Sequence, residues 1–134
     1  MMELTINGEV YQFNFGMGFL REINRRVSVP VDNIPDVKRN IGLSYLISGV
    51  IDRDPEDLVS LLEAANKSLT PRVTRQLLDS YIDDPETDID ALFEQVIDFL
   101  KSANATKKTT LELLAEVERQ KAKREAEMEA VKTK

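Results

Sequence analysis

Apolar and polar residues alternate near the start of the chain, with a turn signal between two runs. Leu4 and Ile6 alternate with polar neighbours, and the alternation resumes beyond Asn7-Gly8. The apolar residues of the second run are Val10, Tyr11, Phe13 and Phe15. Only Val10 breaks the alternation. Because Asn-Gly suits the positive φ angles of a tight type I′ turn, the pattern predicts a β-hairpin. A lone hairpin is marginal in water, so we expect the following helices to cover it.

Helical spacing replaces this alternation after the glycine-rich segment 16–18. The next apolar residues are Leu20, Ile23 and Val27, at intervals of three and four. This spacing predicts a short amphipathic helix. Pro30 and Pro35 then bracket an irregular link, Val29–Pro35.

The most apolar stretch, Val37–Ile51, predicts a helix that is apolar around most of its circumference, which is typical of a central position. Its apolar residues include Ile41, Leu43, Tyr45, Leu46, Ile47, Val50 and Ile51. Gly42 and Gly49 lie seven residues apart and therefore share one face. Glycine costs a helix interior about 1 kcal/mol relative to alanine. We therefore expect another helix or the hairpin to approach closely at this face.

Three further helix starts are marked by capping residues. Asp54-Pro55 combines a capping carboxylate with a proline suited to a first turn, and Thr70-Pro71 repeats the combination. Thr87, with Asp90 in a capping-box position, predicts the third start. The apolar residues that follow are Leu58, Leu61, Leu62 and Ala65; Val73, Leu77, Leu78 and Tyr81; and Ile89, Leu92, Phe93, Val96, Ile97 and Leu100. Their spacing places each set on one helix face.

The apolar content falls after Asn104. The last residues expected to pack on the rest of the protein are Leu111, Leu113, Leu114 and Val117. From Glu118 onward leucine is absent and no heptad pattern is sustained, so we expect an exposed, fraying helix or a disordered tail. This divides the chain into a hairpin-plus-helices domain, residues 1–108, and a charged tail, residues 109–134. The predicted fold class is α+β, mainly α, with one hairpin and about five or six helices.

Composition narrows the possible functions. The 134 residues suit one domain and contain neither cysteine nor histidine, which removes disulfides, thiolate chemistry and the commonest metal ligand. The net charge is −6, and residues 1–106 alone carry −8, so nucleic acid is not an expected partner. The N-terminus lacks a signal-peptide pattern, and no apolar stretch approaches the roughly 20 residues of a membrane span. We therefore expect a soluble cytosolic protein.

The carboxylate-rich segment Asp83–Asp90 does not match a calcium-binding loop. An EF-hand loop started at Asp84 would place Ile89 where glycine is required and Gln95 where a bidentate glutamate is required. A solvated turn followed by a helix cap explains the segment better.

Gly16-Met17-Gly18 does not match a dinucleotide-binding loop either. The third glycine of that fingerprint would fall at Arg21, and no βαβ unit surrounds it. The other dense acidic stretches lie at helix starts or on polar faces. We therefore expect a protein that is not an enzyme, with no cofactor and no metal.

Candidate contact residues come from two kinds of side chain. The strand-to-helix junction is rich in large apolar residues, and arginines cluster on the first helix and shortly after Thr70-Pro71. Exposed members of the first group would bind an apolar partner surface, whereas the arginines would dock an acidic one. Core packing and local ion pairs are the alternative explanations for these two groups. The candidates are Phe15, Met17, Phe19, Arg21, Arg25, Arg72 and Arg75.

Four long stretches of the chain are distinctive: MELTINGEVYQFNFGMGFLREINRRVSVPVDNIP, NIGLSYLISGVIDRDPEDLVSLLEAANK, TPRVTRQLLDSYIDD and TDIDALFEQVIDFLKSANATKK. These stretches resemble tail assembly chaperones from siphophages and prophages of Gram-positive bacteria. They follow one another from about Met2 to Lys108, and the tail beyond is less distinctive.

The resemblance implies a role before the tail exists, in the cytoplasm of the host, and absence from the mature virion. Such chaperones are thought to coat the tape measure protein, to keep it soluble and to give way to tail tube subunits. The resemblance also implies spiral-like homo-oligomers and a longer, frameshifted form of the same protein, with this chain as the short form. It transfers no catalytic residue. Competing hypotheses are another interaction module, such as an adaptor or inhibitor, and a minor structural virion protein.

Overall fold

The chain begins with an antiparallel hairpin formed by β1 (Met2–Ile6) and β2 (Glu9–Phe13). Met2 pairs with Phe13 and Ile6 pairs with Glu9, so a two-residue turn joins the strands. Both turn residues have positive φ, 53° at Asn7 and 81° at Gly8, as the Asn-Gly signal requires. The predicted hairpin is confirmed.

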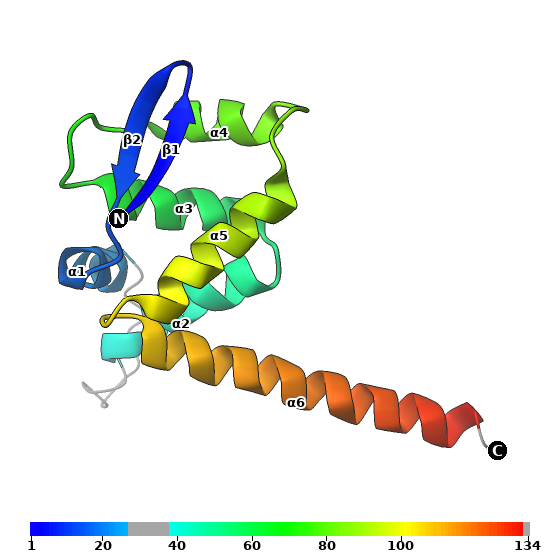
Figure 1. Ribbon diagram of the computed structural model, residues 1–134. Helices are drawn as coiled ribbons and strands as arrows, with labels where there is room; N and C mark the ends of the chain where they lie inside the picture. The colour runs from blue at the N-terminus through cyan, green and yellow to red at the C-terminus, as the bar shows by residue number, and fades with distance from the viewer. Residues whose placement is uncertain (27–37, 133–134) are drawn as a thin grey trace.

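The computed structural model describes residues 1–26 and 38–132, and in these residues six helices follow the hairpin (Figure 1). They are α1 (Met17–Arg26), α2 (Lys38–Ile51), α3 (Pro55–Asn66), α4 (Arg75–Asp83), α5 (Ile89–Ser102) and α6 (Lys107–Lys132). The architecture is therefore α+β and mainly α, as predicted. The expectations for Val27, for the link Val29–Pro35 and for Val37 lie outside the described residues.

The core joins the inner face of the hairpin to α3 and its neighbours. Leu58, Leu61 and Leu62 of α3 are fully buried, and α3 packs against β2, α1, α2 and α4. The predicted apolar face of α5 is also buried, apart from the half-buried Ile89. α2 contacts α1, α3, α5 and α6, which fits its predicted central position. Tyr45 is the exception, because its side chain is exposed.

Two predicted caps are wrong by one to four residues. Thr70-Pro71 does not start a helix. α4 begins at Arg75, and the Thr74 side chain accepts a hydrogen bond from the Leu77 N–H at 3.1 Å. Val73 is therefore buried just before the helix rather than within it.

The predicted cap at Thr87 is also corrected. The Thr87 hydroxyl donates to the Tyr81 carbonyl at 2.6 Å, and Thr87 lies one residue before the cap of α5. Asp88 is the cap, because its carboxylate accepts from the Ala91 N–H at 3.0 Å. The acidic stretch before α5 is thus a turn and a helix cap.

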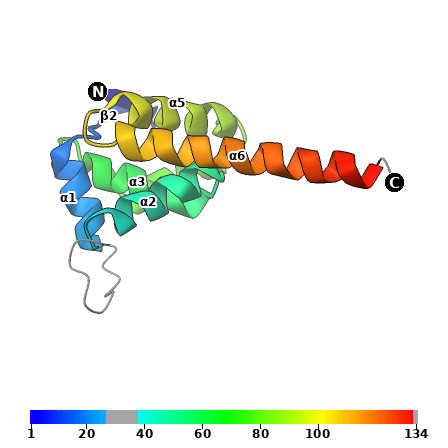
Figure 2. The ribbon, with the colours of Figure 1, turned by 90° about the horizontal axis from the view of Figure 1, so that it is seen from below.

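α6 is one continuous helix with two different surroundings. Its first turns lie beside α2 and α5, where Thr110 is buried and Leu113 and Leu114 are half-buried against the core. From Glu118 to Val131 every side chain is exposed. Figures 1 and 2 show this second half projecting away from the other helices. Within the described ranges, no helix is long and apolar enough to cross a membrane.

Candidate protein-binding surface

Three phenylalanine rings meet where the hairpin passes into α1. The ring of Phe15 packs edge-on against Phe19, with centroids 5.2 Å apart and planes at 81°. Phe99 of α5 lies 6.3 Å from Phe15. Phe15 and Phe19 are each only 4% exposed, so these two candidates serve mainly as core residues. Their contact fixes the position of the segment between strand and helix.

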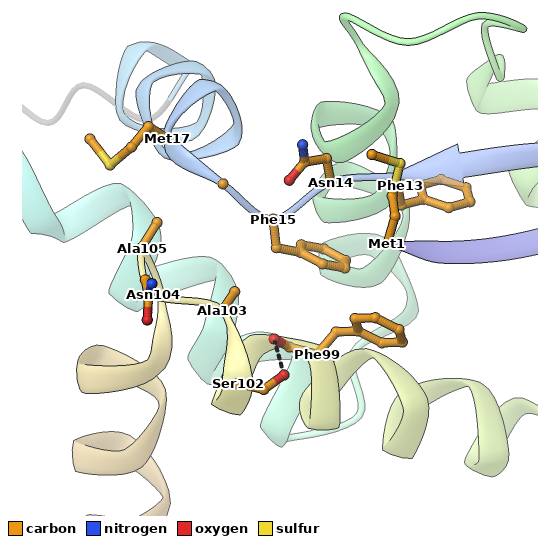
Figure 3. A pocket seen from close by; sticks show the side chains of 11 residues that line it. Met1, Phe13, Asn14, Phe15, Met17, Phe99, Ser102, Ala103, Asn104 and Ala105 are labelled. Carbon is orange, nitrogen blue, oxygen red and sulfur yellow. Dashed lines mark hydrogen bonds between the residues drawn. The ribbon is translucent and has the colours of Figure 1, made fainter.

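An open pocket of about 530 Å³ lies beside this ring cluster (Figure 3). It is lined by Met1, Phe13, Asn14, Phe15, Gly16, Met17, Phe99, Ser102, Ala103, Asn104 and Ala105. Figure 3 shows the Phe15 ring directed toward α5, where Phe99 lies, with Met17 on the other side of the pocket. Met17 is 51% exposed and is therefore the candidate apolar residue that a partner reaches most easily.

Hydrogen bonds hold the chain segment on this side of the pocket in place. The Asn14 N–H donates to the Ala65 carbonyl at 3.0 Å, which ties the end of β2 to the end of α3. The Leu20 N–H donates to the Gly16 carbonyl at 3.0 Å and starts α1. The pocket is therefore largely pre-formed, which lowers the entropy cost of binding there.

Glu22 of α1 is the centre of a cluster of ion pairs. It accepts from Arg25 at 2.7 Å, from Arg26 at 2.8 Å and from Lys67 at 2.7 Å. The hydrogen bond from Arg25 is the main cause that lowers the pKa of Glu22 to about 2, with help from Lys67 and Arg26 and against the effect of burial. Arg25 is thus an exposed arginine whose charge is partly neutralised by its own helix.

The second arginine group is anchored mainly on α3. Arg75 donates to the Ser60 hydroxyl at 3.1 Å and lies 3.8 Å from Glu56 and 4.0 Å from Glu63. Glu63 also pairs with Arg26 at 3.0 Å, so one carboxylate links α1, α3 and α4. Through Glu63, Arg75 is linked to the ion-pair cluster on α1, and sequence spacing did not predict this link.

The remaining arginine candidates are solvated. Arg21 and Arg72 both have exposed side chains. Arg21 lies on α1 with Met17, whereas Arg72 lies in the loop before α4. The structure therefore places Phe15, Met17 and Phe19 around one junction and distributes the four arginines over a wider surface.

Sequence reasoning missed Phe99 and the link that follows α5. Phe99 lies at the edge of the apolar α5 face, three residues after Val96, and the small residues from Ser102 to Ala105 leave space beside it. The signal was a run of small side chains directly after a strongly apolar helix. Its place opposite Phe15 depends on tertiary packing, which periodicity does not report.

The side chains around the pocket are those of a candidate binding surface. In residues 1–26 and 38–132, no group of three or more Asp or Glu side chains is placed to hold a metal ion. The pocket is lined mainly by aromatic, thioether and small side chains, which are suited to holding an apolar side chain of a partner. The polar groups at its wall are the side chains of Asn14, Ser102 and Asn104.

The sequence profile of one protein family, described as phage tail assembly chaperone protein (TAC), matches residues 3–114. The match spans the hairpin, the first five helices and the docked turns of α6. The chain belongs to this family of phage tail assembly chaperones. Comparison with curated proteins and with solved structures gives no match. The family match ends at Leu114, before the projecting half of α6. The ion-pair cluster and, apart from Met1, the residues that line the pocket therefore lie within the matched residues.

Proposed function

We propose that this tail assembly chaperone binds the tape measure protein of its phage, keeps it soluble and helps to recruit tail tube subunits. The observation that carries the proposal is the open apolar pocket at the junction of β2, α1 and α5, in a chain whose family acts in tail assembly. A long helical client exposes apolar side chains that aggregate unless they are covered. A pocket of this size accepts one or two such side chains from each client segment.

The residues around the pocket fit weak and reversible contact. Met17 has a flexible, polarizable side chain that adapts to different apolar partners. The exposed Arg21 and Arg25 lie on the same helix as Met17, beyond the pocket lining, and would offer charges to acidic residues of the client. Many copies that each bind weakly would coat a long client and still be displaced one at a time. Phe15 and Phe19 are the buried residues on which this surface packs, and Arg72 and Arg75 extend the surface toward α4.

The wider setting is part of the same proposal. The chaperone acts in the cytoplasm of an infected or lysogenic Gram-positive host and is absent from the finished virion. It corresponds to the short form, with a longer frameshifted form as a partner, and copies associate head to tail into open spirals. A head-to-tail contact that does not close produces a spiral rather than a ring. In this proposal the folded domain is residues 1–108 and the tail is residues 109–134, whose first turns dock on α2 and α5 and whose end would carry an extension.

The deciding experiment is co-expression of the chain with the tape measure protein from the same genome, followed by affinity capture and light scattering. We expect the tape measure protein to become soluble and to co-purify with many copies of this chain. A tape measure protein that stays insoluble, with this chain alone and also with the longer form, would overturn the proposal. Mass spectrometry of purified phage tests the expected absence from the virion separately.

A further inference from the structure

Phe15 is buried, but its main-chain N–H and C=O make no hydrogen bond with any residue in the ranges 1–26 and 38–132. Its two neighbours differ from it. The Asn14 N–H donates to the Ala65 carbonyl, and the Gly16 carbonyl accepts from the Leu20 N–H. Buried main-chain groups are almost always paired, and an unpaired one costs about as much as a lost hydrogen bond. The two groups of Phe15 therefore require a partner from outside this part of the chain.

The direction of these two groups follows from the alternation along β2. The Gln12 carbonyl accepts from the Asn66 side chain at 2.9 Å, and the Asn14 N–H also bonds to the end of α3, so the main-chain groups of these residues face α3. Successive residues of a strand direct their main-chain groups to opposite edges. Phe15 continues the alternation, because it is buried like Phe13 whereas Asn14 is exposed. The groups of Phe13 and Phe15 therefore face the edge where β1 lies.

β1 provides a partner for Phe13 but not for Phe15. Met2, the first residue of β1, pairs with Phe13. The pocket lies at the next position along this edge, because Met1, Phe13, Asn14 and Phe15 all line it. Figure 3 shows Met1 at the start of β1, close to Phe15. The open pocket therefore gives access to the unpaired main chain of Phe15.

We propose that an extended segment of the client pairs with the main chain of Phe15, in line with β1, and places one large apolar side chain in the pocket. The N–H of one client residue donates to the Phe15 carbonyl, and the carbonyl of the same residue accepts from the Phe15 N–H. In strand addition of this kind the main-chain bonds give affinity and the pocket selects the side chain. The proposal rests on the proposed function, because it names the form in which the tape measure protein is bound.

The same geometry sets the kind of client residue. Side chains of directly paired residues in neighbouring strands lie on the same face. The Phe15 ring is directed toward α5, where Phe99 lies (Figure 3), so the paired client side chain enters the pocket beside these two rings. The rings and the thioether of Met17 favour a large apolar side chain, whereas a charge there would be costly. The client residues on either side point away from the pocket and can be polar.

An extended segment fits this position better than a helix. Main-chain groups inside a helix already bond to one another, so they cannot also offer a donor and an acceptor to Phe15. Continued by one residue, the register of the hairpin sets Met1 opposite Asn14. Met1 thus limits the pairing to a single client residue, beyond which the segment turns away. Each copy of the chaperone would therefore hold a short, unfolded stretch of its client weakly.

Overlapping synthetic peptides from the tape measure protein test the pairing on the complete chain. Fluorescence anisotropy identifies the peptides that bind, and each residue of such a peptide is then methylated in turn at its main-chain nitrogen. Methylation removes one N–H and leaves the side chain in place. We expect one sensitive position, a large apolar residue at which the dissociation constant rises at least about tenfold. The two residues beside it serve as matched controls, with changes below about twofold.

The other outcomes separate this proposal from the proposed function. Equal losses at several neighbouring positions would indicate a helical peptide and would overturn the pairing. Capture of the complete tape measure protein without binding of any peptide would also overturn it, because the client would then be bound in folded form, and the proposed function would stand. If neither the peptides nor the complete protein bind, both proposals are wrong.

Hydrogen exchange followed by NMR gives an independent measurement at Phe15 itself. Saturation with a bound peptide should slow exchange of the Phe15 N–H at least about tenfold. The Val10 N–H is the control, because it also makes no hydrogen bond to a described residue but lies outside the pocket. An unchanged Phe15 rate with peptide bound contradicts the proposal. Slowing that needs only a higher concentration of the chain, without peptide, would assign the position to a second copy instead.

Discussion

The carboxylate of Asp57 fills the space beside Gly49 in which any other residue would place its Cβ. An ideal Cβ built on Gly49 lies 1.7 Å from Asp57 Oδ2 and 2.8 Å from Asp57 Cβ. Both distances are far shorter than van der Waals contact. Gly49 belongs to α2 and Asp57 to the first turn of α3, so these helices approach closely because position 49 lacks a side chain. The close approach expected at Gly49 is confirmed.

Gly49→Ala is therefore expected to destabilise the protein although alanine favours helices. The steric conflict with Asp57 should lower the free energy of unfolding by about 1–3 kcal/mol, more than the roughly 1 kcal/mol gained from helix propensity. Urea denaturation followed by circular dichroism measures the change. Combining it with Asp57→Ala should recover part of the loss, because the contact with Asp57 Oδ2 disappears whereas the Cβ at position 57 remains 2.8 Å away.

Gly18→Ala provides the matched control for this substitution. Gly18 also lies in a helix, α1, but an added Cβ meets no atom within 4 Å. Alanine there should stabilise the protein by about 0.5–1 kcal/mol. Equal effects at positions 18 and 49 would show that the contact with Asp57 does not constrain the packing of α2 on α3.

Asn66 joins three separate segments through one buried side chain. Its amide donates to the Gln12 carbonyl at 2.9 Å and to the Pro71 carbonyl at 3.1 Å, and its oxygen accepts from the Val73 N–H at 2.6 Å. Asn66→Ala would leave these backbone groups without their partner. We expect a loss of about 2–4 kcal/mol in the free energy of unfolding, measured by urea denaturation. Asn104→Ala, at an exposed position, should change it by less than about 0.5 kcal/mol.

Local signals explain which parts of the fold were predictable. The Asn7-Gly8 turn and the apolar spacing of α5 depend on residues close together in sequence, and both were predicted correctly. Asp54-Pro55 also acts as predicted, because the Asp54 carboxylate accepts from the Glu56 N–H at 2.9 Å. In each case the residues that carry the signal also make the contact.

The errors arise where a residue outside the capping motif makes a hydrogen bond that competes with the local signal. Thr70-Pro71 has the composition of a helix start, but Asn66 hydrogen-bonds the backbone at Pro71 and Val73 and holds this segment out of a helix. The Thr87 hydroxyl hydrogen-bonds the Tyr81 carbonyl, and Asp88 caps α5 instead. Phe99 likewise lines the pocket only because α5 packs near Phe15. Sequence reasoning therefore predicted which types of residue lie at the junction, but it did not predict the shape of the pocket that they form.

The Glu22 cluster gives the protein a pH-dependent contribution to stability. Its pKa is lowered from 4.5 to about 2, mainly by the hydrogen bond from Arg25. The folded state thus binds the proton more weakly than the unfolded chain, so the contribution is complete above pH 4.5 and is lost as pH falls toward 2. Glu22→Gln should cost about 1–3 kcal/mol at pH 7, and the difference from the natural chain should shrink toward pH 2.

Urea denaturation at a series of pH values measures this effect. Glu116→Gln is the matched control, because Glu116 pairs with Arg119 on the solvent-exposed face of α6. Exposed pairs contribute about 0–1 kcal/mol, so the control should change little at any pH. If the cost of Glu22→Gln stays constant from pH 7 to pH 2.5, it arises from packing rather than from the charge of Glu22.

Met17→Glu is expected to weaken the proposed binding of the tape measure protein without unfolding the chaperone. Met17 is 51% exposed at the edge of the apolar pocket and is the first residue of α1. A carboxylate at a helix N-terminus is electrostatically favourable, so the fold should be retained. A charge at the mouth of an apolar pocket should weaken capture of the tape measure protein at least about tenfold in a quantitative pull-down. Val10→Glu, at a 46% exposed position on the hairpin, is the control. Equal capture by both variants would exclude the pocket as the client site, because the two substitutions add the same charge and differ only in where they place it.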